Sequence, residues 1–410
     1  MKIYAFEGLR YTDRAGDASE LAAPPFDQID DALRDRLHGR APHQFSHLTR
    51  PVPSSGLDGH HHAAALHRRW LEEGTVRAEA EPSLYPYAIE LGDGGTRLGL
   101  TCLISVASGT EDDLRPHEET VDKPLADRSG LLHAMRVDLE PVLLLAEDEN
   151  GAFETMLRED VGGSSLLLEH EDEPTGDRHL LYRFGSRPRI DAYRELLRPR
   201  FAAIADGHHR TKVAGMFARE TGAAEGTAAA TKLAVLGSLA SPDLRIDPIH
   251  RAVIVELDTT ALATLARERA PLVTESGAAI AAAVAAASSP AVGVWQRGGR
   301  PEIWHLEPEA APGATASPAA VLLHRQMLRR AGLAPTADRD GSIVYRAAAE
   351  EVARMVRDGE ASVGFWLPPM EPAEFAAVTA RRELLPPKST RFLPKLVSGL
   401  VWSAHNLPLG

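Results

Sequence analysis

Residues 205–210, Ala-Asp-Gly-His-His-Arg, combine the groups that a protein uses to hold an anion. They follow the apolar run 201–204 and precede 211–218, an order that predicts a strand, a tight turn and a helix. We expect the helix to begin near His208 or His209. The first N–H groups of a helix have no partner within it, and the helix dipole adds positive charge there.

Two imidazoles and a guanidinium beside a helix start are unfavourable unless something negative compensates them. A phosphate is the natural guest of such a place. We therefore expect Gly207, His208, His209 and Arg210 to bind phosphate, with Asp206 as a catalytic carboxylate and metal ligand. The alternative is an ordinary Asp-Gly turn followed by surface histidines.

A second cluster begins with His117 and Glu118 and continues through Glu119, Thr120, Asp122, Asp127 and Arg128. A histidine beside carboxylates suits general acid–base chemistry or a divalent cation held by oxygen ligands. His117 and Glu118 are therefore candidate catalytic residues, and Glu118 is also a candidate metal ligand. The alternative is a solvated acidic loop.

Two further segments carry polar groups between prolines. In residues 386–395, donors that suit phosphate oxygens come from Lys388, Ser389 and Thr390. The alternative for this segment is a charged C-terminal loop. Residues 46–51 are expected to form a strand closed by proline, whose alternating faces could line a pocket or be ordinary sheet surface. The candidate substrate residues are His47, Thr49, Arg50 and Arg128.

The surrounding pattern alternates strands and helices. We expect strands at 3–6, 85–89, 97–106, 141–145, 201–204, 231–239 (or an apolar helix segment) and 244–255, and helices at 30–37, 60–71, 131–135 and 190–197. In the helix at 60–71, Leu66 and Trp70 are four residues apart and form an apolar stripe. Beyond 257, alanine-rich stretches predict helices at 261–270, 278–287 and 318–331, and strands are expected at 292–295, 303–306, 342–345 and 362–367. Residues 307–318, rich in Ala, Pro and Gly, are the expected linker.

The composition sets further bounds. The 410 residues are 44% hydrophobic and 25% charged, with a net charge of -13, which argues against a dominant role in binding nucleic acid. The single cysteine, Cys102, excludes an internal disulfide and lies in an apolar run as a core thiol. No signal peptide or membrane-spanning run is seen. We expect a cytoplasmic protein with no membrane partner.

The ordered motifs resemble the DUF1015 family, whose function is unknown. They are Ala-Pro-Pro-Phe-Asp at 23–27, Ser-His-Leu-Thr-Arg-Pro at 46–51, His-Glu-Glu-Thr at 117–120, the 205–210 segment, and Pro-Pro-Lys-Ser-Thr at 386–390. The resemblance covers nearly the whole chain. The chain departs from the family's usual pattern near Arg136 and at Arg346, where a histidine is common.

The Asp-Gly-His-His-Arg element is in turn similar to the phosphate-binding turn of the ParB/sulfiredoxin-like fold, which includes free-serine kinases. This resemblance implies an α+β fold with a ParB/sulfiredoxin-like core, an additional mixed sheet and a smaller C-terminal α/β region. The expected division is a main domain at 1–256, the smaller region at 257–380, and a segment at 381–410 that returns to the active site.

Together these resemblances imply a nucleotide-dependent kinase that phosphorylates a hydroxyl of a small metabolite such as free serine. ATP or ADP and Mg²⁺ are the expected cofactors, and a small molecule is the expected partner; assembly into a homo-oligomer stays open. Asp206 or Glu118 would orient or deprotonate the hydroxyl. The alternatives are a non-catalytic regulator that binds a nucleotide or phosphometabolite, slightly favoured by the departures, and a phosphohydrolase or tailoring enzyme.

Overall fold

The computed structural model describes residues 1–107, 109–110, 112–118, 125–172, 175–264, 266–287, 290–308, 317–334 and 336–410. It is an α+β structure that divides into two compact units. Unit 1 comprises Met1–Pro116, Asp122–Leu244 and Pro394–Gly410, and unit 2 comprises His117–Val121 and Arg245–Leu393. The units divide after Leu244 and after Leu393, and β14 joins the sheet of unit 2. The expected domain division at 256 and 380, with a returning segment at 381–410, stays a prediction.

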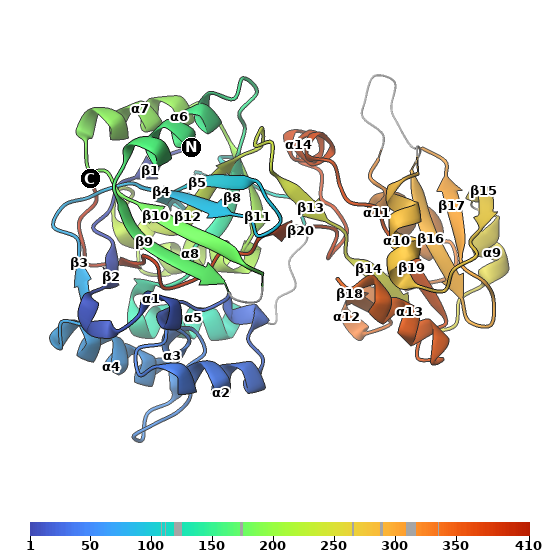
Figure 1. Ribbon diagram of the computed structural model, residues 1–410, viewed down its shortest axis with the longest axis horizontal. Helices are drawn as coiled ribbons and strands as arrows, with labels where there is room; N and C mark the ends of the chain where they lie inside the picture. Colours follow the sequence, from blue (N-terminus) through green and yellow to red (C-terminus); the bar gives the residue numbers. More distant parts are fainter. Residues whose placement is uncertain are drawn as a thin grey trace. The chain divides into compact units, whose positions relative to one another are not determined.

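Nine described strands of unit 1 form one mixed sheet (Figure 1). Its order is β6 (Leu114–Pro116), β11 (Ala202–Asp206), β8 (Val142–Ala146), β12 (Thr231–Ser238), β5 (Thr96–Ser105), β4 (Tyr85–Glu90), β10 (Asp177–Tyr182) and β9 (Leu166–Asp172), with β1 (Ile3–Tyr4) paired to β5. Strand β11 runs parallel to β6 and antiparallel to β8. The apolar runs that predicted strands therefore become the centre of this sheet.

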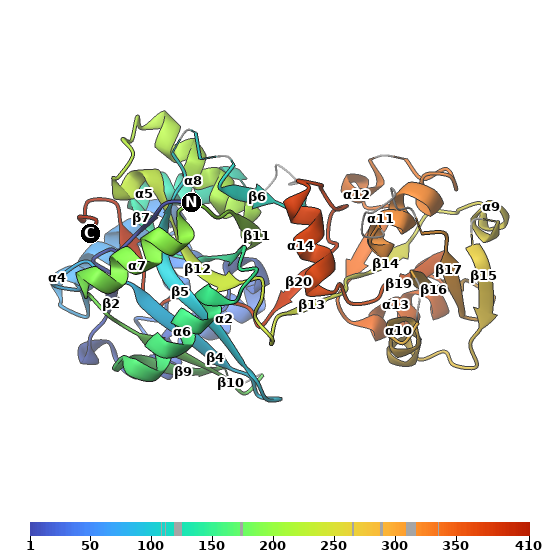
Figure 2. The ribbon, with the colours of Figure 1, turned by 90° about the horizontal axis from the view of Figure 1, so that it is seen from above.

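Helices cover both faces of that sheet (Figure 2). One face carries α6 (Ala152–Gly163) and α7 (Arg187–Leu197), and the other carries α8 (His208–Glu220) and α5 (Leu125–Met135). The core between α6, α7 and the sheet includes Leu100, Cys102, Phe153 and Tyr193, each fully buried. Cys102 is thus a core thiol, as predicted.

Unit 1 also contains four further α-helices and two pairs of short strands among its described residues. The helices are α1 (Ala18–Leu21), α2 (Asp31–Arg40), α3 (Ser46–Thr49) and α4 (Gly59–Glu72), and the paired strands are β2 (Leu9–Tyr11) with β3 (Val76–Ala78) and β7 (Val137–Asp138) with β21 (Ser403–Ala404). In α4, the side chains of Leu66 and Trp70 are buried, as their spacing of four residues predicted.

The strand expected at 46–51 is wrong, because this segment forms the helical turn α3. The side-chain oxygen of Gln44 accepts a hydrogen bond from the Ser46 amide at 2.6 Å, and the Arg50 amide donates to the Ser46 carbonyl at 2.8 Å. Pro51, which has no N–H, follows the turn. The alternating faces assigned to this segment therefore do not exist.

Unit 2 is built on a six-stranded sheet in the order β15 (Ala266–Pro271), β17 (Glu302–Leu306), β16 (Ala291–Gln296), β19 (Val363–Trp366), β14 (His250–Val253) and β18 (Ile343–Arg346). Helices α10 (Gly277–Ala285) and α13 (Ala349–Arg357) pack on one face, and α11 (Ala319–Leu322) with the π-helical η4 (Leu323–Leu328) packs on the other. The other elements are α9 (Thr259–Ala263), α12 (Ala337–Asp340), α14 (Pro372–Ala380) and the pair β13 (Arg245–Asp247) with β20 (Arg391–Leu393).

The helix expected at 261–270 is wrong beyond residue 263, because strand β15 replaces it. Alanine favours helix, but Arg269 faces β17, where its guanidinium forms a bidentate pair with Glu302 at 2.7–2.9 Å. Tertiary pairing thus overrides local propensity. Most of the expected linker, residues 309–316, lies outside the described residues.

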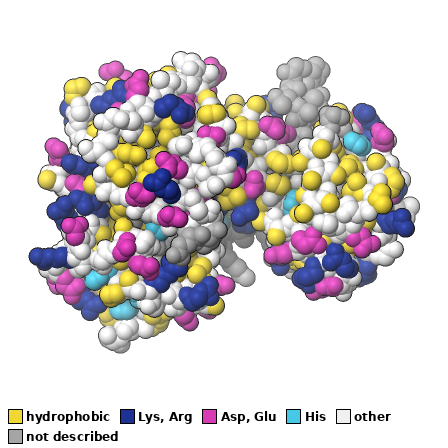
Figure 3. Space-filling view, viewed as in Figure 1, with side chains coloured by type: hydrophobic (Ala, Val, Ile, Leu, Met, Phe, Trp, Pro, Cys, Tyr) yellow, Lys and Arg dark blue, Asp and Glu magenta, His cyan; other side chains and the backbone are white. Residues whose placement is uncertain are grey.

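Two surface properties complete the description. No described helix is long and apolar enough to cross a membrane. On the face that Figure 3 shows, Lys and Arg side chains are mixed with Asp and Glu side chains. The acidic excess is therefore not gathered into one patch on that face.

Candidate functional site

The predicted turn joins β11 to α8 through Gly207, whose φ of +96° lies in the left-handed region. A Cβ added at Gly207 would lie 2.5 Å from Cγ1 of Val142, a fully buried residue of β8. Only glycine meets both conditions, because other residues rarely adopt this φ and none lacks a Cβ. The helix therefore starts at His208, as predicted.

Asp206 ends β11 beside a shift in the β11–β8 register, which falls between Ile204 and Asp206. Bulges of this kind re-aim side chains next to functional sites. The Asp206 carboxylate lies 3.1 Å from Lys395 Nζ and 3.7 Å from Arg210 Nη2. Burial would raise the pKa of Asp206, but Lys395 and Arg210 hold it below its ordinary value. Asp206 is therefore anionic at neutral pH.

Lys395 is a contributor that the sequence analysis did not assign. It lies in the proline-bounded segment 386–395, which was singled out for Lys388, Ser389 and Thr390. The signal for Lys395 was thus its membership of that motif, whereas its partner Asp206 is 189 residues away in the sequence.

The side chain of Arg210 packs against Pro141 at the end of residues 138–141 and is mostly buried. Its Nη1 donates to the Pro141 carbonyl at 2.6 Å, and its side chain is 9% exposed. Burial works to lower the pKa of Arg210, but carboxylates led by Glu140 and Asp206, with Asp27 and Asp138, hold it above its ordinary value. The Pro-Pro-Phe-Asp motif is thereby brought to the same place as the phosphate turn.

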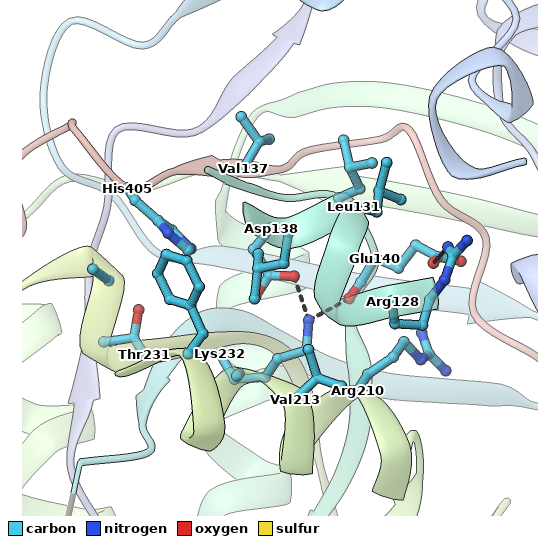
Figure 4. Close-up of a pocket in the computed structure, with 15 residues that line it drawn as sticks. Arg128, Leu131, Val137, Asp138, Glu140, Arg210, Val213, Thr231, Lys232 and His405 are labelled. Atoms are coloured by element: carbon cyan, nitrogen blue, oxygen red, sulfur yellow. Dashed lines mark hydrogen bonds and ion pairs between the residues drawn. The ribbon is translucent and has the colours of Figure 1, made fainter. Parts of the chain in front are cut away.

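A cavity of about 50 Å³ lies beside Arg210, between α5 and α8 (Figure 4). Its wall includes Lys232, which donates to the Asp138 carboxylate and, at 2.7 Å, to the Glu140 carbonyl. Burial lowers the pKa of Lys232, against the opposing effect of Asp138. The ion pair between Lys232 and Asp138 was not predicted from the sequence. The one indication of it there is that Lys232 is a charged residue inside the apolar run 231–239.

Arg128 lines this cavity and also a larger cleft of about 310 Å³. The cleft is bounded by Arg34, Arg50, Pro51, Pro53, Asp58, Gly59, His60, Asp127 and Arg128. Arg128 donates to the Thr49 carbonyl at 2.9 Å and lies 3.6 Å from the Glu140 carboxylate. Three of the four predicted substrate residues, Thr49, Arg50 and Arg128, are therefore at or beside this cleft.

His47 lies elsewhere. Its ring stacks on His38 with centroids 4.0 Å apart, and its Nε2 lies 3.3 Å from the Ala41 carbonyl. Burial lowers the pKa of His47 to about 4, so the ring is neutral at physiological pH. Its contacts are those of a packed side chain.

The second predicted cluster is assembled within unit 2. His117 Nε2 lies 2.7 Å from Thr390 Oγ1, and the His117 ring meets the edges of Phe375 and Phe392. The Leu385 amide donates to the His117 carbonyl at 2.8 Å. The structure thus brings together two motifs that are more than 260 residues apart in the sequence.

Glu118 follows His117 and lies next to the other members of the 386–390 motif. Burial raises the pKa of Glu118, although hydrogen bonding from the Lys388 backbone and the charges of Lys388 and Arg251 oppose this. Ser389 Oγ is turned inward, where it donates to the Pro386 carbonyl at 2.6 Å. Glu119, Thr120 and Asp122 lie outside the described residues.

The predicted site residues therefore fall into two sets. Asp206, Gly207, His208, His209, Arg210 and Arg128 belong to unit 1, and His117, Glu118, Lys388, Ser389 and Thr390 belong to unit 2. Among the described residues, no group of three or more His, Cys, Asp or Glu side chains could hold a metal ion alone. A Mg²⁺ bound largely by phosphates needs only one or two carboxylates.

Solved structures with a similar arrangement include a free serine kinase in complex with AMP, with 14% identity and a TM-score of 0.39 over 72% of this chain and 87% of that one. A conserved hypothetical protein from Pyrococcus furiosus matches with 14% identity and a TM-score of 0.38, over 73% and 94%. SbnI from Staphylococcus aureus, truncated at its C-terminus, matches with 12% identity and a TM-score of 0.36, over 72% and 84%. Likenesses of this size assign no function.

No curated protein matches the chain. The model of the family described as "Protein of unknown function (DUF1015)" matches residues 3–308, which is most of the chain and includes four of the five motifs. The resemblance drawn from those motifs is confirmed, and the chain belongs to the DUF1015 family.

Proposed function

We propose that the chain is a nucleotide-dependent kinase that transfers a phosphoryl group to the hydroxyl of a small metabolite. The observation that carries the proposal is the start of α8: a glycine that no other residue can replace, the N-terminus of a helix, two histidines and an anionic aspartate held by Lys395. The order of strand, turn and helix also supports a counterpart of the ParB/sulfiredoxin-like phosphate turn.

In this proposal, ATP or ADP places its phosphates at Gly207, His208 and His209. Arg210, bonded to the Pro141 carbonyl, adds fixed positive charge behind the turn. Phosphoryl transfer depends mainly on positioning and on stabilising the charge of the transferred group. A preorganised set of donors therefore suits this reaction.

The two carboxylates take different roles because their pKa values move in opposite directions. Asp206, whose pKa is lowered, stays ionised and suits orientation of the acceptor or a place among the ligands of Mg²⁺. When bound, Mg²⁺ would neutralise phosphate charge. Glu118 belongs to unit 2, and its pKa, raised by burial, is the property that a general base needs. His117 positions this segment through Thr390.

The acceptor is assigned to the cleft of about 310 Å³ in unit 1. Arg50 and Arg128 line it, and guanidinium groups favour acceptors that carry a carboxylate or phosphate. Lys388, Ser389 and Thr390 are proposed as hydrogen-bond donors to phosphate within unit 2. A homo-oligomer is not required by any of these roles.

A second candidate function is a regulator that binds a nucleotide or phosphometabolite without turnover. The internal contacts of Arg210 favour a regulator. Its guanidinium donates to the Pro141 carbonyl and lies near the Asp206 carboxylate, so it stabilises the charge of a transition state less strongly. The departures from the family pattern near Arg136 and at Arg346 also favour a regulator.

The test incubates the purified protein with ATP or ADP, Mg²⁺ and a panel of hydroxy metabolites, with phosphorus NMR as the readout. A new phosphate monoester supports the kinase. Release of inorganic phosphate without a phosphorylated acceptor supports a phosphohydrolase, and binding without turnover supports the regulator. No binding and no turnover would overturn all three. His61→Ala, at an exposed histidine on α4, is the control for His209→Ala.

A further inference from the structure

Arg251 in unit 2 is a fully buried arginine on β14, the strand next to the edge strand β18 of its sheet. It lies on β14, opposite Tyr345 of β18 on one side and Phe365 of β19 on the other. Arginine is almost never fully buried unless its charge is paired. Its surroundings should therefore supply an anion.

The protein satisfies only part of the Arg251 guanidinium. Nη1 donates to the Ile249 carbonyl. Nε and Nη2 are buried and have no hydrogen-bond partner in the part of the chain that the structure describes. These two nitrogens form one edge of the planar group, and that edge matches two oxygens of a carboxylate or phosphate.

The groups around Arg251 leave this edge without an ion partner. The ring of Tyr345 faces the guanidinium, with its centroid 5.5 Å from Cζ, and its hydroxyl donates a hydrogen bond to the Asp338 carboxylate. Burial lowers the pKa of Arg251 to about 10, whereas Tyr345, Glu118 and Asp338 act to raise it. Within the described residues, no ion pair joins Arg251 to a carboxylate.

A second unsatisfied group lies near Arg251. His324 belongs to the π-helical segment η4, a form that is frequent at functional sites. Its Nε2 is buried without a partner among the described residues. Burial, followed by the charge of Arg251, lowers the pKa of His324 to about 3, so the neutral ring can give or accept one hydrogen bond.

We propose that unit 2 contains a binding site for a small monoanionic carboxylate, held by the Nε–Nη2 edge of Arg251 with His324 beside it. A monoanion is favoured over a phosphate dianion because Glu118 and Asp338 already place carboxylates around Arg251. The site stands on the geometry of unit 2 and does not depend on the proposed kinase activity.

The test measures the melting temperature of the full chain during titration with formate, acetate, inorganic phosphate and chloride at constant ionic strength. We expect formate and acetate to raise the melting temperature saturably, and chloride to have no such effect. In Arg251→Met, the apparent affinity for these carboxylates should fall about tenfold or more, because two charge-assisted hydrogen bonds are lost. Without added anion, this variant should be at least as stable as the parent.

Arg251→Lys provides a second variant, since it keeps the charge and removes the fork; it should also weaken carboxylate binding. Arg269→Met is the matched control, because Arg269 is exposed and already paired with Glu302. The proposal is overturned if the parent does not respond to carboxylates, if either Arg251 variant responds as the parent does, or if phosphate binds more tightly than acetate.

Discussion

Replacing Gly207 with alanine should destabilise unit 1 more than the same replacement at Gly222, the glycine beyond the other end of α8. The left-handed backbone costs a residue with a Cβ about 1–2 kcal/mol. The new Cβ would also meet Val142 Cγ1 at 2.5 Å and Val142 Cβ at 3.0 Å. Since Val142 is fully buried, it cannot easily move away, and overpacking adds about 1–3 kcal/mol.

Gly222, just beyond the end of α8, supplies the matched control. Its φ of +61° also lies in the left-handed region, but nothing lies within 4 Å of an added Cβ. Gly222→Ala should therefore cost only the backbone strain of about 1–2 kcal/mol. The difference between the two variants isolates the contact with Val142.

Hydrogen exchange of peptides from β8 and α8 measures this difference in unit 1 alone, and urea unfolding gives the total change. Val142→Ala removes Cγ1, the atom that the new Cβ would meet most closely. The free energy of unfolding lost in the double variant Gly207→Ala and Val142→Ala should therefore be smaller than the sum of the two single losses. The reasoning is refuted if Gly207→Ala is no more damaging than Gly222→Ala, or if the double variant shows no recovery.

Three further predictions follow from buried or shifted groups. Burial lowers the pKa of His67 to about 4, and its Nε2 accepts a hydrogen bond from Trp402 Nε1 at 3.1 Å. The contribution of neutral His67 to stability is complete above about pH 6.5, and roughly 3 kcal/mol is lost as the pH falls through about 4. The urea midpoints at pH 7 and pH 5 should therefore differ less in His67→Gln than in the parent. Lys232→Met leaves the Asp138 carboxylate buried and unpaired, which should lower the free energy of unfolding in urea by about 3–5 kcal/mol. Adding Asp138→Asn should restore part of that free energy. Equal stability of the parent and Lys232→Met would contradict the pairing. If Glu118 is the base, Glu118→Gln should lower kcat about 10²- to 10⁴-fold with little change in nucleotide affinity, and parental activity should rise with pH through the raised pKa of Glu118; an unchanged kcat would remove that role.

Local signals were enough to predict the turn at Gly207 and most of the elements. The apolar run before Asp206, the glycine and the polar helix start are all contiguous, so the strand, the turn and the start of α8 are confirmed. In the same way, the spacing of Leu66 and Trp70 predicted the buried face of α4.

Errors arose where contacts with residues outside the segment decide its structure. The segment 46–51 alternates like a strand, but the side chain of Gln44 caps a helical turn there. Alanines at 261–270 favour a helix, but pairing with β17 makes most of this segment a strand. The buried partners of Lys232 lie more than 90 residues away, so nothing near it in the sequence could reveal them.

The central claim is that nucleotide phosphates bind at the start of α8. Isothermal titration of the purified chain with ATP, ADP and AMP in the presence of Mg²⁺ tests it most directly. The account predicts binding that weakens as phosphates are removed, a loss of affinity of about tenfold or more in His209→Ala, and no change in His61→Ala. Absence of nucleotide binding, or equal affinity in the parent and His209→Ala, would contradict it.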